Sequence, residues 1–444
     1  MLKPLAFCLL ACAALPAQQI PAATELPGRP FYIEQTWVIG GEGNWDYLTL
    51  DPAARRLYIA HGHAVQVVDI DSGAVSGVIG GLGDAHAIAL DDRGEYGYIS
   101  DGVASMVRVF DRRTLRVVAS IPTGPLPRAL VFEPQSGLLF AVCATPVNPG
   151  PANPQPSARP QPRPGNAPAR PPARTPAKPA AEEEFRSSIT VIDAEKQEAL
   201  ADILMPGRLG FAATDGNGQV FINIVNRNQI ARLDAASIGA MARGRSSSPS
   251  IGQAAAEPSN PTPKASTPQA AAADPSETPA ADWSNQTRLP PSAAGRLAFL
   301  ALGPDCREPH GLALDGVHQR LFAACANMKL VVLNAVNGDQ LAALPIGPGV
   351  EAVGYDPGRN LIFTANGGSD GSLTVIRQHV TDTYSEIQNL PTRQRARTLA
   401  VDPVTGAVYL ITDVMGVKTT PPGGIGSLQP EPVKGSFQVL AIGN

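Results

Sequence analysis

Two stretches decide the fold: Asp46-Tyr47-Leu48-Thr49-Leu50-Asp51, followed by Leu57-Tyr58-Ile59-Ala60, and His86-Ala87-Ile88-Ala89-Leu90-Asp91, followed by Tyr96-Gly97-Tyr98-Ile99-Ser100. Each reads as an apolar strand that ends in an acid, then a turn, then a second apolar strand that carries an aromatic residue near its start. The copies start at residues 46 and 86, a spacing of 40 residues. Four short strands in about 40 to 45 residues are typical of one blade of a β-propeller.

Five further copies follow, with the same strand, turn and aromatic residue. They begin at residues 128, 210, 310, 351 and 397. A third apolar strand, as at 65–69 and 107–111, and a fourth, as at 75–79 and 117–121, complete the unit. The sequence therefore predicts an all-β fold, a seven-bladed β-propeller of four-stranded antiparallel blades.

The last copy ends at residues 436–440 and leaves no room for a fourth strand. Residues 32–39, which precede the first copy, can supply it and remove a free sheet edge. We therefore predict that the N-terminal strand closes the ring. An open stack with capping repeats is the alternative, but neither end shows a polar cap.

The repeat predicts one propeller domain over residues 31–444, and the 43% hydrophobic content is enough for a large core. Two insertions interrupt it: residues 145–181, rich in proline, and residues 243–282, rich in proline, serine and alanine. Both are predicted to be disordered, because neither composition can bury a core. The first carries five basic residues that could hold an anionic polymer of the envelope, although a solvated linker is the favoured interpretation.

Residues 1–17 read as a signal peptide, with Lys3 before an apolar stretch at 5–15 that is too short to span a bilayer. Cleavage after Ala17 predicts a periplasmic or secreted protein with no transmembrane segment after signal removal. Leu9-Leu10-Ala11-Cys12 also resembles a lipoprotein cleavage box. In that alternative, an acylated Cys12 tethers the propeller to a membrane.

Three cysteines follow the signal: Cys143, Cys306 and Cys325. Cys306 lies just before the first strand of the fifth blade, and Cys325 ends its second strand. Adjacent antiparallel strands bring such positions together, so we predict a disulfide between them, which export permits. Cys143 holds the equivalent position in the third blade without a partner, and we expect a buried, inert thiol.

The chain resembles the exported YncE-like proteins of the YVTN-repeat propeller class. The resemblance rests on Tyr58-Ile59-Ala60-His61 and its equivalents, on Trp45-Asp46-Tyr47, on Cys306-Arg307-Glu308-Pro309-His310-Gly311 and on Arg397-Thr398-Leu399-Ala400-Val401-Asp402-Pro403. It covers residues 31–444 without the insertions. It implies a seven-bladed ring and an envelope location, supports the cysteine pair, and implies no reaction. Relatives tend to open the fourth blade with an acid, where this chain has Gly210.

The residues that open the first strand of each blade should form a ring at the mouth of the central channel, where propellers commonly bind ligands. In order they are Asp46, His86, Arg128, Gly210, His310, Glu351 and Arg397. Opposite charges alternate around most of this circle and can satisfy one another. Arg128 is the exception, because its neighbours are His86 and Gly210, and Gly210 is expected to leave space beside it. We therefore predict that Arg128 holds an anion such as a carboxylate or a phosphate.

Composition and motifs narrow the function without identifying it. A net charge of −4 gives no bias toward nucleic acid, and 5% aromatic residues, mostly within strands, argue against single-stranded nucleic-acid binding. We find no dinucleotide or phosphate-loop motif and predict no cofactor, metal site or catalytic residue; His61-Gly62-His63 reads as a hairpin.

The favoured interpretation is a monomeric binding or scaffold module of the bacterial envelope. Its ligand at the channel mouth would be an unidentified small anion or an envelope protein or polymer. The alternative is a hydrolase or lactonase-like propeller that uses His86, His310 and an acid.

Overall fold

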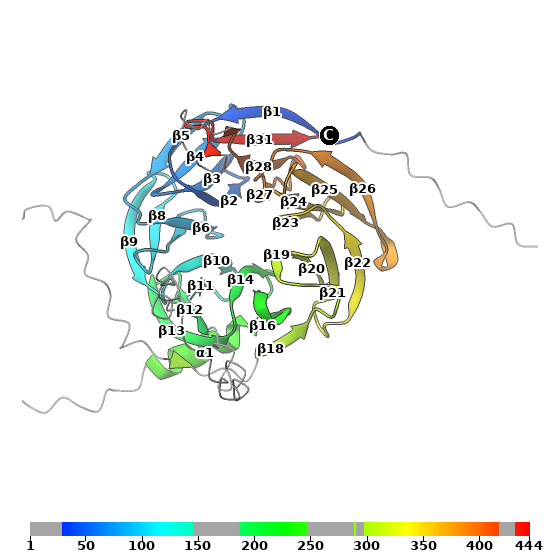
Figure 1. Cartoon of the computed structure of the whole chain (residues 1–444). Coiled ribbons are helices and arrows are strands. Elements are labelled where there is room, and N and C mark those ends of the chain that lie inside the picture. The colour runs from blue at the N-terminus through cyan, green and yellow to red at the C-terminus, as the bar shows by residue number, and fades with distance from the viewer. Residues whose placement is uncertain (1–28, 145–185, 247–287, 290–296, 417–430) are drawn as a thin grey trace, which may run out of the picture.

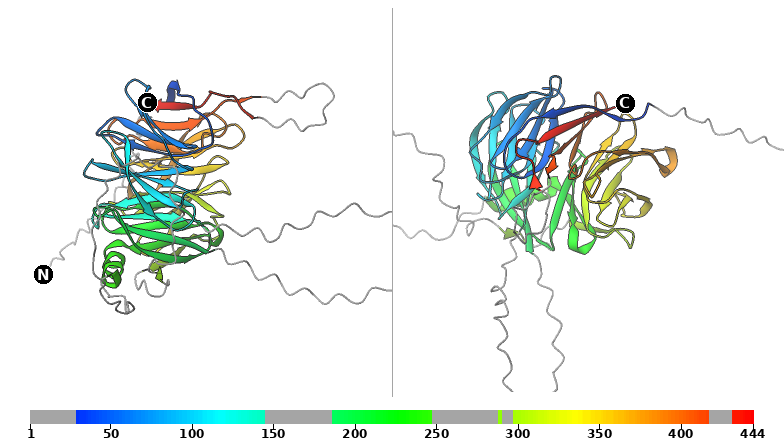
Figure 2. Two further views of the ribbon diagram at one scale, coloured as in Figure 1. Left: turned by 90° about the vertical axis from the view of Figure 1, so that its left-hand side faces the viewer. Right: turned by 45° about the horizontal axis from the view of Figure 1, so that its top comes forward.

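The computed structural model describes residues 29–144, 186–246, 288–289, 297–416 and 431–444. Within these ranges seven antiparallel sheets of four strands stand around a central axis like the blades of a propeller (Figure 1), as predicted. The views of Figure 2 show the blades stacked side by side around this axis. The predicted signal peptide and the 145–181 insertion lie outside the described residues.

Blades 1 to 6 take their four strands in chain order, from the channel outward. Blade 1 comprises β2 (Trp45–Asp51), β3 (Arg56–His61), β4 (Ala64–Asp69) and β5 (Val75–Ile79). Blade 2 comprises β6 (Ala85–Leu90), β7 (Tyr96–Asp101), β8 (Met106–Asp111) and β9 (Arg116–Pro122). Blade 3 comprises β10 (Pro127–Glu133), β11 (Leu138–Cys143), β12 (Arg186–Asp193) and β13 (Glu198–Pro206).

The other half of the ring continues this order. Blade 4 comprises β14 (Leu209–Thr214), β15 (Gln219–Ile224), β16 (Gln229–Asp234) and β18 (Leu297–Ala301). Blade 5 comprises β19 (Pro309–Asp315), β20 (Arg320–Cys325), β21 (Lys329–Asn334) and β22 (Gln340–Pro345). Blade 6 comprises β23 (Val350–Asp356), β24 (Leu361–Asn366), β25 (Ser372–Gln378) and β26 (Tyr384–Pro391).

Blade 7 joins the two ends of the chain. It consists of β27 (Leu399–Val401), β28 (Val408–Thr412), β31 (Gln438–Gly443) and, outermost, β1 (Tyr32–Val38). Strand β1 pairs antiparallel with β31, from Tyr32 opposite Gly443 to Val38 opposite Gln438. The N-terminal strand therefore closes the ring, as predicted, and covers the outer edge of β31.

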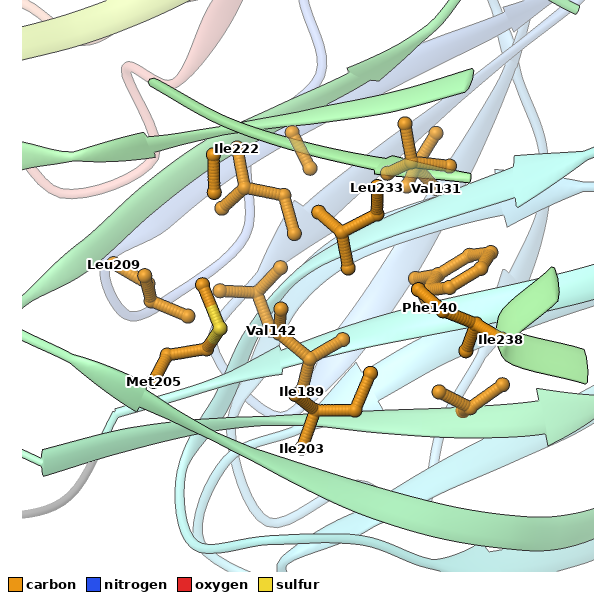
Figure 3. Close-up of a cluster of buried hydrophobic side chains, with 14 of the residues drawn as sticks. Val131, Phe140, Val142, Ile189, Ile203, Met205, Leu209, Ile222, Leu233 and Ile238 are labelled. Carbon is orange, nitrogen blue, oxygen red and sulfur yellow. The ribbon is translucent and has the colours of Figure 1, made fainter. Parts of the chain in front are cut away.

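The aromatic residue near the start of each second strand packs between blades. Six of them, Tyr58, Tyr98, Phe140, Phe221, Phe322 and Phe363, are at most 1% exposed. Figure 3 shows one such interface, in which Phe140 and Ile189 of blade 3 lie in one cluster with Ile222 and Leu233 of blade 4. Because every blade is covered on both faces, its inner strands are apolar along almost their whole length.

The acid that ends each inner strand caps the turn that follows. The carboxylate of Asp91, for example, accepts the backbone N–H of Gly94 at 2.9 Å, of Glu95 at 3.1 Å and of Tyr96 at 3.0 Å. The same bond to a nearby backbone N–H recurs at Asp51, Glu133, Asp215, Asp315, Asp356 and Asp402. The repeated acid is thus a turn-forming residue, and it lies at the face opposite the channel mouth.

Helix α1 (Ala235–Ser246) departs from the sequence prediction, because residues 243–246 are helical and the predicted insertion starts at 243. Asp234 caps the helix by accepting the N–H of Ser237 at 2.8 Å, and Ile238 and Ala242 are fully buried. The described residues contain five further short elements. β17 (Arg288–Leu289) is a parallel fifth strand beside β13, and β29 (Met415–Gly416) pairs with β30 (Glu431–Pro432). Two 3-10 turns span Val225–Arg227 and Val380–Asp382.

Candidate functional site

The predicted ring residues lie at irregularities of the inner strands. In blades 1 to 6 the register between the first two strands shifts beside the ring residue, as between Trp45 and Leu48 in β2 and between Pro127 and Ala129 in β10. Such a bulge re-aims a side chain out of the regular alternation of a strand. In blade 7 the ring residue Arg397 precedes β27.

On one side of the mouth the ring charges are paired. Buried His86 places Nδ1 2.8 Å from Asp46 Oδ2, and its Nε2 lies 3.2 Å from Asp84 Oδ2 without the alignment of a hydrogen bond. Arg397 Nε lies 3.0 Å from Glu351 Oε2. Burial raises the pKa of Glu351, Arg397 lowers it, and the charge of Asp46 raises it further. Asp46 with His86 and Glu351 with Arg397 thus form two of the contacts that the alternating pattern predicts.

Two aromatic rings, those of Tyr47 and Phe211, meet across the channel next to the ring residues, and we call this contact the floor of the mouth. Tyr47 follows Asp46 in blade 1, and its ring meets Phe211 of blade 4 edge-on, with centroids 5.1 Å apart. Strands β2 and β14 lie on opposite sides of the channel (Figure 1). Burial raises the pKa of Tyr47, and the carboxylates of Asp46 and Glu351 raise it further, while Arg397 and Arg128 act in the opposite direction. Tyr47 therefore lies among the ring charges.

Among the described residues Arg128 has no charged partner, unlike Arg397, the other arginine of the ring. Its side chain is exposed, and it forms no hydrogen bond or ion pair with any residue in the described ranges. Two further arginines, Arg208 before β14 and Arg307 before β19, are also exposed and unpaired within those ranges. We call Arg128, Arg208 and Arg307 the basic arc. It spans the mouth loops of blades 3, 4 and 5, where Glu308 and Asp305 are the neighbouring acids.

The space expected at Gly210 is already filled. A Cβ atom at this position would lie 2.9 Å from Cγ2 of Val225 and 3.5 Å from Cβ of Asn223, both from blade 4 itself. The prediction that Gly210 leaves room for a ligand beside Arg128 was therefore wrong, because the side chains of the adjacent strand and turn occupy that volume. Any ligand of Arg128 has to approach from the open side of the mouth.

His310 lies half-buried beside the basic arc. Burial lowers its pKa, and the nearby Arg208 lowers it further, whereas Glu308 acts in the opposite direction. The backbone of His310 is bound to blade 4, because Asn223 Nδ2 donates to the His310 carbonyl at 2.9 Å. No contact between His310 and His86 is found in the described residues, so the two histidines do not form one acid–base pair in this structure.

The predicted disulfide is present between Cys306 and Cys325, whose Cα atoms are 5.3 Å apart. It fixes the loop that carries Arg307 and Glu308, whose N–H groups donate to Asn327 Oδ1 at 3.0 Å and to Asn228 Oδ1 at 2.9 Å. Cys143 is buried and unpaired, and burial raises the pKa of its thiol to about 12.

The histidines of the first hairpin are engaged in local contacts. His61 Nδ1 lies 2.8 Å from Gln66 Oε1, and His63 Nδ1 lies 2.6 Å from the Gly83 carbonyl. Within the described ranges, no group of three or more His, Cys, Asp or Glu side chains could hold a metal ion. None of the described helices is long and apolar enough to cross a bilayer.

Sequence reasoning missed Tyr47 and Phe211, although each directly follows a ring position. An aromatic residue at that place in two nearly opposite blades, where the other blades carry small residues, was the available signal. This pattern predicts a contact only if the channel is narrow enough for the two rings to meet, and the repeat does not encode the diameter of the channel.

No family model matches the chain, and no curated protein has a similar sequence. Solved structures do match. A chain of the mitotic checkpoint complex is 12% identical, with a TM-score of 0.56 over 90% of this chain and 96% of that chain. A chain of the hydrazine synthase of Kuenenia stuttgartiensis is 12% identical, with a TM-score of 0.53 over 85% and 95%. U3-55K is 9% identical, with a TM-score of 0.54 over 91% and 97%. At these identities the likeness shows the fold alone.

Proposed function

We propose that the protein is a binding module whose channel mouth holds an anionic group at the basic arc. The group is a carboxylate or a phosphate, carried by a small molecule or by a partner protein. The observation that carries the proposal is the state of Arg128: it is exposed at the mouth without a partner in the described residues, whereas Asp46 pairs with His86 and Glu351 with Arg397.

The chemistry of arginine supports this ligand class. A guanidinium presents a planar set of donors that matches carboxylate and phosphate oxygens and is always charged. Arg208 and Arg307 extend the positive charge along the adjacent loops, so a ligand with several anionic groups fits better than a single anion. The contact between Tyr47 and Phe211 crosses the channel next to the ring residues and gives a ligand at the mouth an aromatic surface to rest on.

The location of the protein outside the cytoplasm is also part of the proposal. A disulfide is rare in the cytosol and common in exported proteins, so Cys306–Cys325 supports a periplasmic or secreted location. Signal cleavage, the Cys12 alternative and the resemblance to YncE-like proteins remain predictions. A scaffold role in an assembly is in keeping with the fold, since one similar chain belongs to a mitotic checkpoint complex.

The hydrolase alternative is less favoured by the geometry of the two histidines. Both ring nitrogens of His86 face carboxylates, those of Asp46 and Asp84. Nδ1 of His86 is thus engaged by Asp46, and in the described residues no contact joins His86 to His310, so the two histidines do not act on one substrate as a pair.

A thermal-shift screen with inorganic phosphate and citrate tests the proposal, because a ligand that binds only the native state raises the unfolding midpoint. The comparison is between Arg128→Gln and Arg116→Gln. The second variant removes an arginine on outer strand β9 that is also exposed and, within the described ranges, unpaired. We expect a rise in the parent and in Arg116→Gln that is absent in Arg128→Gln. An equal rise in all three, or none in any, contradicts the proposal.

A further inference from the structure

A cavity of about 340 Å³ lies between blades 7 and 1. Its walls are the loop 41–43 and the segment 431–435, and its remaining lining consists of Trp45, His61, Asp413 and Phe437. This volume falls in the range of small-molecule sites, which is roughly 300 to 1,000 Å³. We propose that this cavity is a second binding site, for a small neutral ligand with adjacent hydrogen-bond donor and acceptor atoms, such as an amide or a hydroxyl group.

Two lining residues carry buried polar atoms without partners in the described part of the chain. The indole Nε1 of Trp45 has no acceptor, and Oδ1 of Asp413 has no donor. The two residues are only 4% and 5% exposed. Folded proteins rarely leave a buried donor or acceptor unpaired, because each has lost its water without compensation. One unpaired donor and one unpaired acceptor at the same cavity match a group that both accepts and donates.

The other polar atoms of the lining side chains are already engaged. Arg395 Nη1 lies 3.2 Å from Asp413 Oδ2, and its guanidinium covers the Trp45 ring at 4.2 Å from the centroid. His61 contacts Gln66 and the Gly43 carbonyl and packs on Phe437, with ring centroids 4.1 Å apart. Hydrogen bonding of a ligand therefore falls to Trp45 Nε1 and Asp413 Oδ1.

The charge balance favours a neutral ligand. The carboxylate of Asp413 faces the guanidinium of Arg395, and Glu42 pairs with Lys434 at 2.7 Å across the two walls. Burial raises the pKa of Asp413, and Arg395 lowers it. The Glu42–Lys434 pair is exposed, and pairs of this kind contribute little to stability, so it can open to admit a ligand.

The indole N–H resonance of Trp45 offers a direct test. The chain has three tryptophans, so a ¹H–¹⁵N spectrum of the full chain contains few indole signals, and Trp45→Phe assigns one of them. The probes are N-methylacetamide for the amide arm, glycerol for the hydroxyl arm and N-acetylglucosamine, which carries both groups. We expect a saturable shift of the Trp45 signal with at least one probe and no shift of Trp37, whose Nε1 donates to Gln35 on an exposed strand.

Matched variants link the shift to the two unpaired atoms. Trp45→Phe keeps the ring and removes the N–H, and its binding is followed by saturation transfer to the ligand. Asp413→Leu is close in shape and removes both carboxylate oxygens, whereas the amide oxygen of an asparagine would still accept. Trp45→Phe and Asp413→Leu should each weaken binding at least tenfold, whereas Trp37→Phe should leave it unchanged. If Trp45→Phe does not fold, Asp413→Leu alone decides. No saturable shift with any probe, or equal binding in Asp413→Leu, means that water fills the cavity and overturns the proposal.

Discussion

The rings of Tyr47 and Phe211 meet across the propeller axis from blades 1 and 4, with centroids 5.1 Å apart and an interplanar angle of 72°. This edge-on contact joins two blades that share no sheet and lie three blades apart in the ring. The floor of the site is thus a tertiary contact that no single repeat contains.

A double-mutant cycle measures the strength of this contact. Tyr47→Leu and Phe211→Leu should each lower the free energy of unfolding, and the coupling between them should be about 1 kcal/mol, as for other aromatic pairs. Urea denaturation of the parent, the single variants and the double variant gives the coupling. A coupling near zero means that the two rings do not interact in solution.

The depressed pKa of His310 makes stability depend on pH. Its folded pKa lies below the ordinary value of 6.5, so between pH 7 and pH 5 the unfolded chain takes up the proton more readily than the folded chain. Stability should fall as the pH falls through this window. His310→Gln should reduce the fall, whereas substitution of the exposed His63 should not. Parallel pH profiles for His310→Gln and the parent argue against the effect.

Reduction of Cys306–Cys325 should destabilise the fifth blade. The bridge spans a sequence separation of 19 residues, for which the chain-entropy model gives about 3 kcal/mol. Cys306→Ser and Cys325→Ser, made together, should lose this stability and become insensitive to reductant. Denaturation with and without dithiothreitol measures both effects. Cys143→Ser serves as the control, because that thiol is unpaired, and its reductant dependence should match that of the parent.

On the face opposite the mouth, we expect substitution of Arg112 to cause a large loss of stability. Its Nη2 pairs with the buried Asp51 of blade 1, and its Nη1 lies 3.3 Å from Asp91 of blade 2. Removal of one partner of a buried pair typically costs about 3 to 5 kcal/mol, so Arg112→Met should lower the free energy of unfolding by about 3 kcal/mol. Arg116→Met, at an exposed position, should change it by less than about 0.5 kcal/mol. Equal midpoints for the two variants contradict this ranking.

The repeat made most of the fold predictable. Seven copies of an apolar strand, a capping acid and a buried aromatic residue are local patterns, and each is read directly from residues such as Asp91 and Tyr98. Closure by Tyr32–Val38 followed from counting strands, because the last copy lacked one. The disulfide followed in the same way from the positions of its cysteines in one blade.

The features that escaped prediction depend on distances between repeats or on weak local signals. Helix α1 has an alanine- and serine-rich sequence that merges with the insertion, and in its described side chains Ala235, Ile238 and Ala242 mark the buried side. The volume at Gly210 is filled by Val225, a residue of a turn that the repeat pattern does not place. The pairing of Asp46 with His86, in contrast, was predictable, because ring order alone makes them neighbours.

Isothermal titration of the full chain with citrate tests the central claim most directly. We predict saturable binding that weakens about tenfold or more in Arg128→Gln, because a hydrogen bond to a charged group contributes about 1.5 to 3 kcal/mol. Arg208→Gln and Arg307→Gln should have smaller effects, and Arg116→Gln none. Citrate binding of the same affinity in the parent and in Arg128→Gln, or no binding in the parent, would contradict the assignment of the mouth as an anion site.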